Sequence, residues 1–187
     1  MTSRITFIVA ISFTSFVWGQ CLEALTYNCT TFTLSGALIS ATGINNTGVV
    51  VGSFVPESNP SGPSQGFVRD AAGNITIINY PGVTSTQLFT INNKGVIAGL
   101  ASVGTFNPTV TGFTVDLLGN FKTITIPAPY ILISIYGIND NGAISGVASV
   151  PGPTFNTSFF ILNADGTFNV VPQFFTPLPA PSSGVAE

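Results

Sequence analysis

The chain has 187 residues, of which 45% are hydrophobic and 6% charged, with a net charge of −3 and no histidine. The negative charge excludes the basic surface of a typical nucleic-acid-binding protein. Without histidine the chain lacks the commonest general base and transition-metal ligand, and we predict no cofactor and no metal. The Thr, Val, Ile and Phe content favours strands and the Gly and Pro content favours turns, so an all-β fold is predicted.

The N-terminus has the pattern of a secretory signal peptide. Arg4 supplies a positive charge, residues 5–17 are apolar, and Val17 and Gly19 occupy the −3 and −1 positions of a cleavage site. We therefore expect residues 1–19 to be removed and the mature chain to be secreted. An uncleaved anchor is the alternative, although the segment is short for a bilayer span. No membrane span is predicted in the mature chain.

Residues 20–30 form a short segment that contains both cysteines. Cys21 and Cys29 are close enough in sequence to close a small disulfide loop in an exported protein. Cleavage after residue 24 would instead remove Cys21 and leave Cys29 free. A disulfide and free thiols are both compatible with the sequence.

An internal repeat fills most of the remaining chain. TGINNTGVVVGSF, FTINNKGVIAGLA and YGINDNGAISGVA occupy residues 42–54, 89–101 and 136–148. A second block reads GFVRDAAGN, GFTVDLLGN and FFILNADGT at residues 66–74, 112–120 and 159–167. Both blocks recur at steps of 46 or 47 residues. Three copies in near-constant phase predict a tandem repeat fold.

Each unit is predicted to form a four-stranded antiparallel meander, with strands at residues 75–80, 87–92, 96–102 and 111–116 in the middle unit. The repeat domain is placed at residues 31–175, as blades 31–74, 75–120 and 121–167 plus a final strand. Four-stranded units of about 40–50 residues are typical of β-propeller blades. The chain holds fewer than four units and propellers have about 4–8 blades, so we expect an incomplete or open ring of three to four blades.

Two turns of each unit share the pattern [Asn/Asp]-x-x-Gly. This pattern favours a type I turn that begins at the Asn or Asp and places the glycine at positive φ. Because alternate connections of a meander lie at the same end, these turns define a short rim. The longer connections define the opposite, long rim. The predicted turn residues are Asn45, Gly48, Asp70, Gly73, Asn92, Gly95, Asp116, Gly119, Asn139, Gly142, Asn163 and Gly166.

Ligand contacts are expected on the long rim, since binding residues often lie on variable loops above a rigid scaffold. Aromatic faces next to amides suit carbohydrates, although aromatic residues in strand-rich chains also commonly pack in the core. Phe67, Phe113 and Phe160 are predicted to be core residues. The candidate contact residues are Tyr80, Phe106, Asn107, Tyr130, Phe155 and Asn156.

Two motifs suggest site chemistry but are better interpreted as turns. NDNG at residues 139–142 resembles the start of a calcium loop, yet Ca²⁺ needs about 6–8 oxygen ligands and Asp140 is the single carboxylate there. Asp70 and Asp116 recur at one repeat position, like paired carboxylates of a hydrolase. Asn163 takes that position in the third unit, and asparagine can cap a turn but cannot act as a general base. No catalytic residue is therefore predicted.

The motifs GINNTGVVVGSF, GINDNGAISG and ITIINYPGVTST resemble the repeat units of bacterial extracellular proteins of the HAF type. The resemblance spans approximately residues 31–171 and implies an exported, propeller-like protein. It carries over no catalytic residue. The family motif contains His-[Ala/Gly]-Phe. At the histidine position this chain has Gln65, Thr111 and Ser158. A role of that histidine is therefore not expected here.

Together these features predict an exported, non-enzymatic scaffold that binds a carbohydrate or protein ligand at the cell surface or outside the cell. Self-association through open blade edges is also expected. The alternatives are a carboxylate-dependent extracellular hydrolase or lyase, and an inert degenerate paralogue without a ligand. Residues 176–187, rich in Pro, Gly and Ser, are predicted to be a tail without regular structure.

Overall fold

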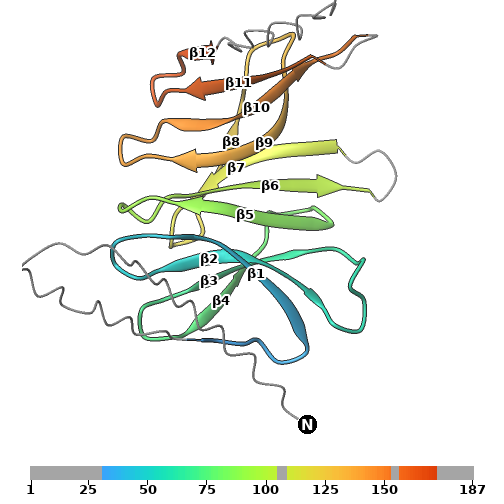
Figure 1. The fold of residues 1–187 in the computed structure, drawn as a ribbon, viewed down its shortest axis with the longest axis vertical. Coiled ribbons are helices and arrows are strands. Elements are labelled where there is room, and N and C mark those ends of the chain that lie inside the picture. Colours follow the sequence, from blue (N-terminus) through green and yellow to red (C-terminus); the bar gives the residue numbers. More distant parts are fainter. Residues whose placement is uncertain (1–30, 105–108, 153–155, 172–187) are drawn as a thin grey trace, which may run out of the picture. The chain divides into compact units, whose positions relative to one another are not determined.

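The computed structural model describes residues 31–104, 109–152 and 156–171. The described part contains twelve β-strands and no α-helix, which confirms the predicted all-β class. The strands form three four-stranded antiparallel sheets, in which each strand pairs with its neighbours in sequence (Figure 1). Within the described part, no helix is long and apolar enough to cross a membrane.

Each sheet is a meander of short strands. The first sheet comprises β1 (Ala37–Ile44), β2 (Val50–Pro56), β3 (Gln65–Arg69) and β4 (Ile75–Ile78). The second comprises β5 (Ser85–Ile91), β6 (Ile97–Val103), β7 (Thr109–Val115) and β8 (Phe121–Ile124). The third comprises β9 (Ile131–Ile138), β10 (Ile144–Val150), β11 (Asn156–Leu162) and β12 (Phe168–Val171).

The sheet boundaries differ from the predicted blade boundaries by one strand. The sequence places the strand at Ile75 at the start of the second blade, but β4 pairs with β3 and closes the first sheet. β8 and β12 close the second and third sheets in the same way, and residues 31–36 form no strand. The physical reason is the tight turn between β3 and β4, which makes its two flanking strands pair as a hairpin. The longer β4–β5 connection carries the chain to the next sheet.

The six [Asn/Asp]-x-x-Gly segments form tight turns on the short rim. In each, the glycine N–H donates to the carbonyl of the Asn or Asp at 2.9–3.1 Å. The glycine φ values lie between 77° and 99°, a region that residues with a Cβ rarely adopt. Side-chain oxygens add further bonds: Asn45 Oδ1 accepts from the N–H groups of Thr47 (3.1 Å) and Val49 (3.0 Å).

A phenylalanine packed over a glycine lies at the centre of every sheet. Phe113 of β7 is opposite Gly99 of β6, and a Cβ added to Gly99 would lie 2.7 Å from the Phe113 ring. Phe67 over Gly52 and Phe160 over Gly146 repeat the arrangement. All three rings are almost fully buried, which confirms the predicted core residues.

The core lies between successive sheets. β5 packs across β1, β2 and β3, and β9 packs across β5, β6 and β7. One hydrophobic cluster joins Val51 and Val68 of the first sheet to Leu88 and Phe113 of the second. Another joins the second sheet to the third, and Figure 1 shows the second sheet between the other two. The first strand of the second sheet and that of the third sheet therefore each lie on the face of the preceding sheet, as in propeller blades.

Candidate functional site

A row of asparagines on the short rim links the three sheets. Asn45 Nδ2 donates to the carbonyl oxygen of Asn92 at 3.3 Å, and Asn92 Nδ2 donates to that of Asn139 at 2.9 Å. We call Asn45, Asn92 and Asn139 the asparagine ladder. Each ladder side chain also caps its own turn through Oδ1. The side-chain oxygen of each ladder asparagine therefore accepts bonds within its own sheet. The side-chain nitrogen of Asn45 and of Asn92 donates to the next sheet. An aspartate lacks the donor for that second bond.

The residue after each ladder asparagine forms a second link. The Asn46 N–H donates to Asn93 Oδ1 at 2.9 Å, and the Asn93 N–H donates to Asp140 Oδ1 at 2.8 Å. Asn93 Nδ2 also donates to Asp140 Oδ2 at 2.9 Å. These bonds hold the pKa of Asp140 below its ordinary value, the side-chain bond from Asn93 being the largest cause. The carboxylate of the apparent calcium motif thus joins two sheets.

We expect no calcium dependence of stability from this motif. Both Asp140 oxygens already accept hydrogen bonds, and no group of three or more His, Cys, Asp or Glu residues occurs in the described part of the chain. A thermal melt of the full chain should give the same midpoint in Ca²⁺ and in EGTA. A midpoint that rises with Ca²⁺ concentration would show binding to the native state and contradict the turn interpretation.

Asp70 and Asp116 cap their own turns and lie in different sheets. Asp70 accepts from Asn74 Nδ2 at 2.7 Å and from the Asn74 N–H at 2.8 Å, and Asn120 bonds to Asp116 in the same way. These bonds lower the pKa of both carboxyl groups, with the side-chain bond from the following asparagine as the largest cause. This geometry supports the cap interpretation over paired catalytic carboxylates.

Acid should destabilise the fold partly through these two caps. Their folded pKa lies below the ordinary value of 3.8, so their contribution is present above that pH and is lost as pH falls through the folded pKa. We expect the melting temperature to fall as the pH is lowered below about 4, and to fall less in the Asp70→Asn, Asp116→Asn double variant. Equal acid sensitivity of the two proteins would contradict this assignment.

The predicted contact residues are only partly brought together. The Tyr80 ring packs on Phe113 and Phe121, with centroids 5.1 and 5.3 Å away, and its hydroxyl lies 3.0 Å from Thr123 Oγ1. Tyr130 packs on Phe168 at 5.1 Å. Both rings thus contribute to the core at the long rim. Asn156 begins β11, while Phe106, Asn107, Phe155, Cys21 and Cys29, with the segments 1–30 and 172–187, lie outside the described residues.

The long rim does contain a polar cavity. A pocket of about 240 Å³ lies between the β2–β3 and β4–β5 connections. Its lining is uncharged and includes the amides of Asn59, Gln65 and Asn79. Asn79 is held in place, because its Oδ1 accepts from the Gly66 N–H at 3.2 Å and its Nδ2 donates to Gln65 Oε1 at 3.4 Å. The remaining lining residues are Pro56, Pro63, Ser64, Val83, Thr84 and Thr86.

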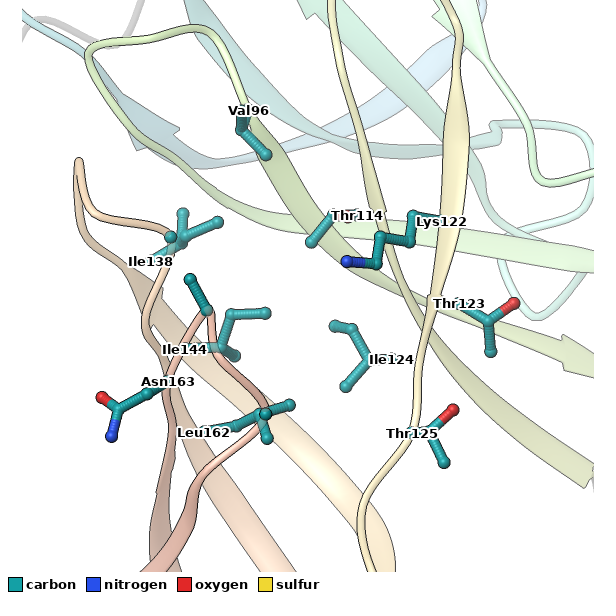
Figure 2. A pocket seen from close by; sticks show the side chains of 13 residues that line it. Val96, Thr114, Lys122, Thr123, Ile124, Thr125, Ile138, Ile144, Leu162 and Asn163 are labelled. Atoms are coloured by element: carbon teal, nitrogen blue, oxygen red, sulfur yellow. The ribbon is translucent and has the colours of Figure 1, made fainter.

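A larger groove of about 360 Å³ lies between the second and third sheets, against short-rim turns. Figure 2 shows Lys122 and Ile124 directed from β8 into this groove, toward Ile138 and Leu162. This groove was not predicted, because the sequence pattern favours binding on the long rim. The alternation of Lys122 and Ile124 with outward Thr123 is a strand pattern, but it does not reveal which sheet lies opposite.

A scan against protein-family models finds no match to the chain, and a search of curated proteins finds no significantly similar sequence.

Proposed function

We propose that the protein is an exported, non-enzymatic binding scaffold whose long-rim pocket takes a neutral, hydroxyl-rich ligand such as a carbohydrate. The HAF-type resemblance and the signal-peptide pattern support export. The uncharged pocket lined by the amides of Asn59, Gln65 and Asn79 is the observation that carries the ligand class. Amides donate and accept at once, as sugar hydroxyls do, and the absence of a charged lining residue disfavours ionic ligands.

The binding proposal is tested by titrating the full chain with a panel of neutral and acidic oligosaccharides. Asn59→Ala should weaken binding of any neutral glycan that binds the unmodified chain, because it removes an exposed amide from the pocket. Asn141→Ala is the matched control, since it removes an exposed amide from the short rim. Equal loss in both variants, or binding of acidic glycans alone, would contradict the proposal.

Self-association is the second component of the proposed function. The outer strands β1 and β4 of the first sheet, and their counterparts in the other sheets, each have one side without a partner strand in the described part of the chain. Unpaired strand edges favour association with other chains.

A further inference from the structure

One face of the third sheet is uncovered. β5 covers the first sheet and β9 covers the second, whereas no strand of the described chain covers the corresponding face of β9, β10 and β11. On that face Ile161 is 41% exposed, while Val68, at the same repeat position in the covered first sheet, is 7% exposed. Tyr136 and Phe159 lie beside each other there, with ring centroids 6.4 Å apart, and both are exposed. We call this surface, defined by Tyr136, Asn139, Phe159 and Ile161, the tail face.

The first sheet exposes the kind of surface that would cover the tail face. Ile91 of β5 packs onto the preceding sheet and is 6% exposed, whereas its counterpart Ile44 in β1 is 67% exposed. Leu88 is buried against the preceding sheet, and its counterpart Ala41 is exposed. We call the surface that contains Ala41, Ile44, Asn45 and Asn46 the head face.

The hydrogen-bonding groups of the two faces are complementary. The next donor of the asparagine ladder is Asn139 Nδ2, and the next donor of the second link is the Asp140 N–H. Neither has an acceptor among the described residues. The matching acceptors at the other end are the Asn45 carbonyl and Asn46 Oδ1. The Asn45 carbonyl accepts from the Gly48 N–H. It can take a second bond, because the equivalent Asn92 carbonyl accepts from both Gly95 and Asn45.

The shapes of the two faces also correspond. A Cβ on Gly66 would lie 2.8 Å from the Leu88 side chain, so that glycine makes room for leucine on the next sheet. In the third sheet Phe159 takes the place of that glycine, and in β1 Ala41 takes the place of the leucine. Relative to the first sheet–sheet contact, the large residue is therefore on the tail side and the small residue on the head side of the proposed contact.

A hollow on the third sheet marks where a strand would lie. It has a volume of about 330 Å³ and is lined by Gly137, Asn139, Ser145 and Ile161, among others. At the first sheet–sheet contact, a Cβ on Gly43, the counterpart of Gly137, would lie 3.1 Å from the Thr90 Cα. The backbone of β5 therefore fills the equivalent space at the first contact.

We propose that the tail face binds the head face of a second copy of this chain. In that contact β1 of the second copy lies across β9–β11, Asn139 Nδ2 donates to its Asn45 carbonyl, and the Asp140 N–H donates to its Asn46 Oδ1. The contact is heterologous and continues the asparagine ladder across two chains. Two such contacts would close a ring of six sheets, within the usual range of about 4–8 propeller blades.

This inference deepens the self-association component of the proposed function and assigns it to sheet faces. It does not rest on glycan binding, because the pocket lies on the long rim and the ladder on the short rim. Loss of assembly with intact glycan binding, or the reverse, therefore identifies which of the two proposals has failed.

The test uses one variant of each face, Phe159→Glu for the tail and Ile44→Glu for the head. Both side chains are exposed, so in dilute solution, where self-association does not add to stability, both variants should melt like the unmodified chain. The unmodified chain should have at least twice the single-chain mass by light scattering. Each variant alone should be a single chain, with self-association weakened by roughly a hundredfold, because the glutamate would be buried without a partner. Their one-to-one mixture should form a pair, since it retains one intact tail and one intact head.

Leu118→Glu is the control, because Leu118 is highly exposed on a turn outside both faces and should leave the assembly unchanged. If a face variant melts early, Tyr136→Glu or Ala41→Glu replaces it. A single-chain mass for the unmodified protein at every concentration would overturn the proposal. So would dimers that persist in Ile44→Glu alone, which would indicate a symmetric tail-to-tail contact, and so would a mixture that does not pair.

Discussion

Replacing Phe113 by alanine should lower the free energy of unfolding by about 3–5 kcal/mol, the usual cost of removing a buried phenylalanine ring. The ring is fully buried and contacts Tyr80 and Phe121, and it covers the backbone at Gly99. Because it lies in the cluster between the first and second sheets, its loss leaves a cavity where the two sheets meet. Neighbouring strands cannot close this cavity without breaking their register.

Urea unfolding of the dilute protein measures this effect. Phe159→Ala is the control, since it removes the same ring from the adjacent strand position of the third sheet, where half of the side chain is exposed. The midpoint should fall strongly for Phe113→Ala and only slightly for Phe159→Ala. Equal shifts would mean that the contact between the first two sheets contributes little to stability.

Replacing Asn92 by aspartate should cost about 3 kcal/mol, because the change removes the donor to the Asn139 carbonyl and places a buried carboxylate oxygen beside that carbonyl. Asn92 is 5% exposed, and its Nδ2 bonds to the Asn139 carbonyl at 2.9 Å. Its own turn does not require the amide nitrogen, since the bonds from Lys94 and Val96 go to Oδ1. The expected loss therefore reports the link between sheets.

Asn163→Asp is a closely matched comparison for this variant. It makes the same chemical change at the first position of the same kind of turn, and the other two sheets already carry Asp70 and Asp116 there. We expect its free energy of unfolding to stay near that of the unmodified chain. If urea unfolding shows the same loss for both variants, Asn92 acts as a turn cap and the ladder contributes nothing measurable.

The repeat and its turns were predictable because they depend on local chemistry. A four-residue turn needs only a side-chain acceptor at its first position and a glycine at its last, and both are visible in the sequence. The sheet boundaries were not predictable from strand patterns alone. The sequence of β4 is compatible with the last strand of one meander and with the first strand of the next. Turn length decides between them: the tight turn after Asp70 joins β4 to β3.

The asparagine ladder required the structure, because its bonds join residues that meet only when sheets stack. One sequence signal did exist. The turns at Asn45, Asn92 and Asn139 never use aspartate, whereas the other three turns use it twice. An amide retained where a carboxylate would cap equally well indicates that its nitrogen has a partner. At the long rim, the loops of the polar pocket were predicted, but Tyr80 and Tyr130 pack into the core instead of extending from the rim.

Hydrogen exchange at three backbone amides tests the second short-rim link between the sheets, and its continuation to a second chain, most directly. The Asn46 and Asn93 N–H groups bond to the next sheet, so they should exchange slowly at any concentration. The Asp140 N–H should become protected as concentration rises and a second copy supplies its acceptor. Ala71, Leu117 and Ala164, at the second position of the other short-rim turns, are the unbonded references. Exchange at Asn46 and Asn93 as fast as at these references would contradict the second link between the sheets, and an Asp140 amide that never becomes protected would contradict its extension to a second chain.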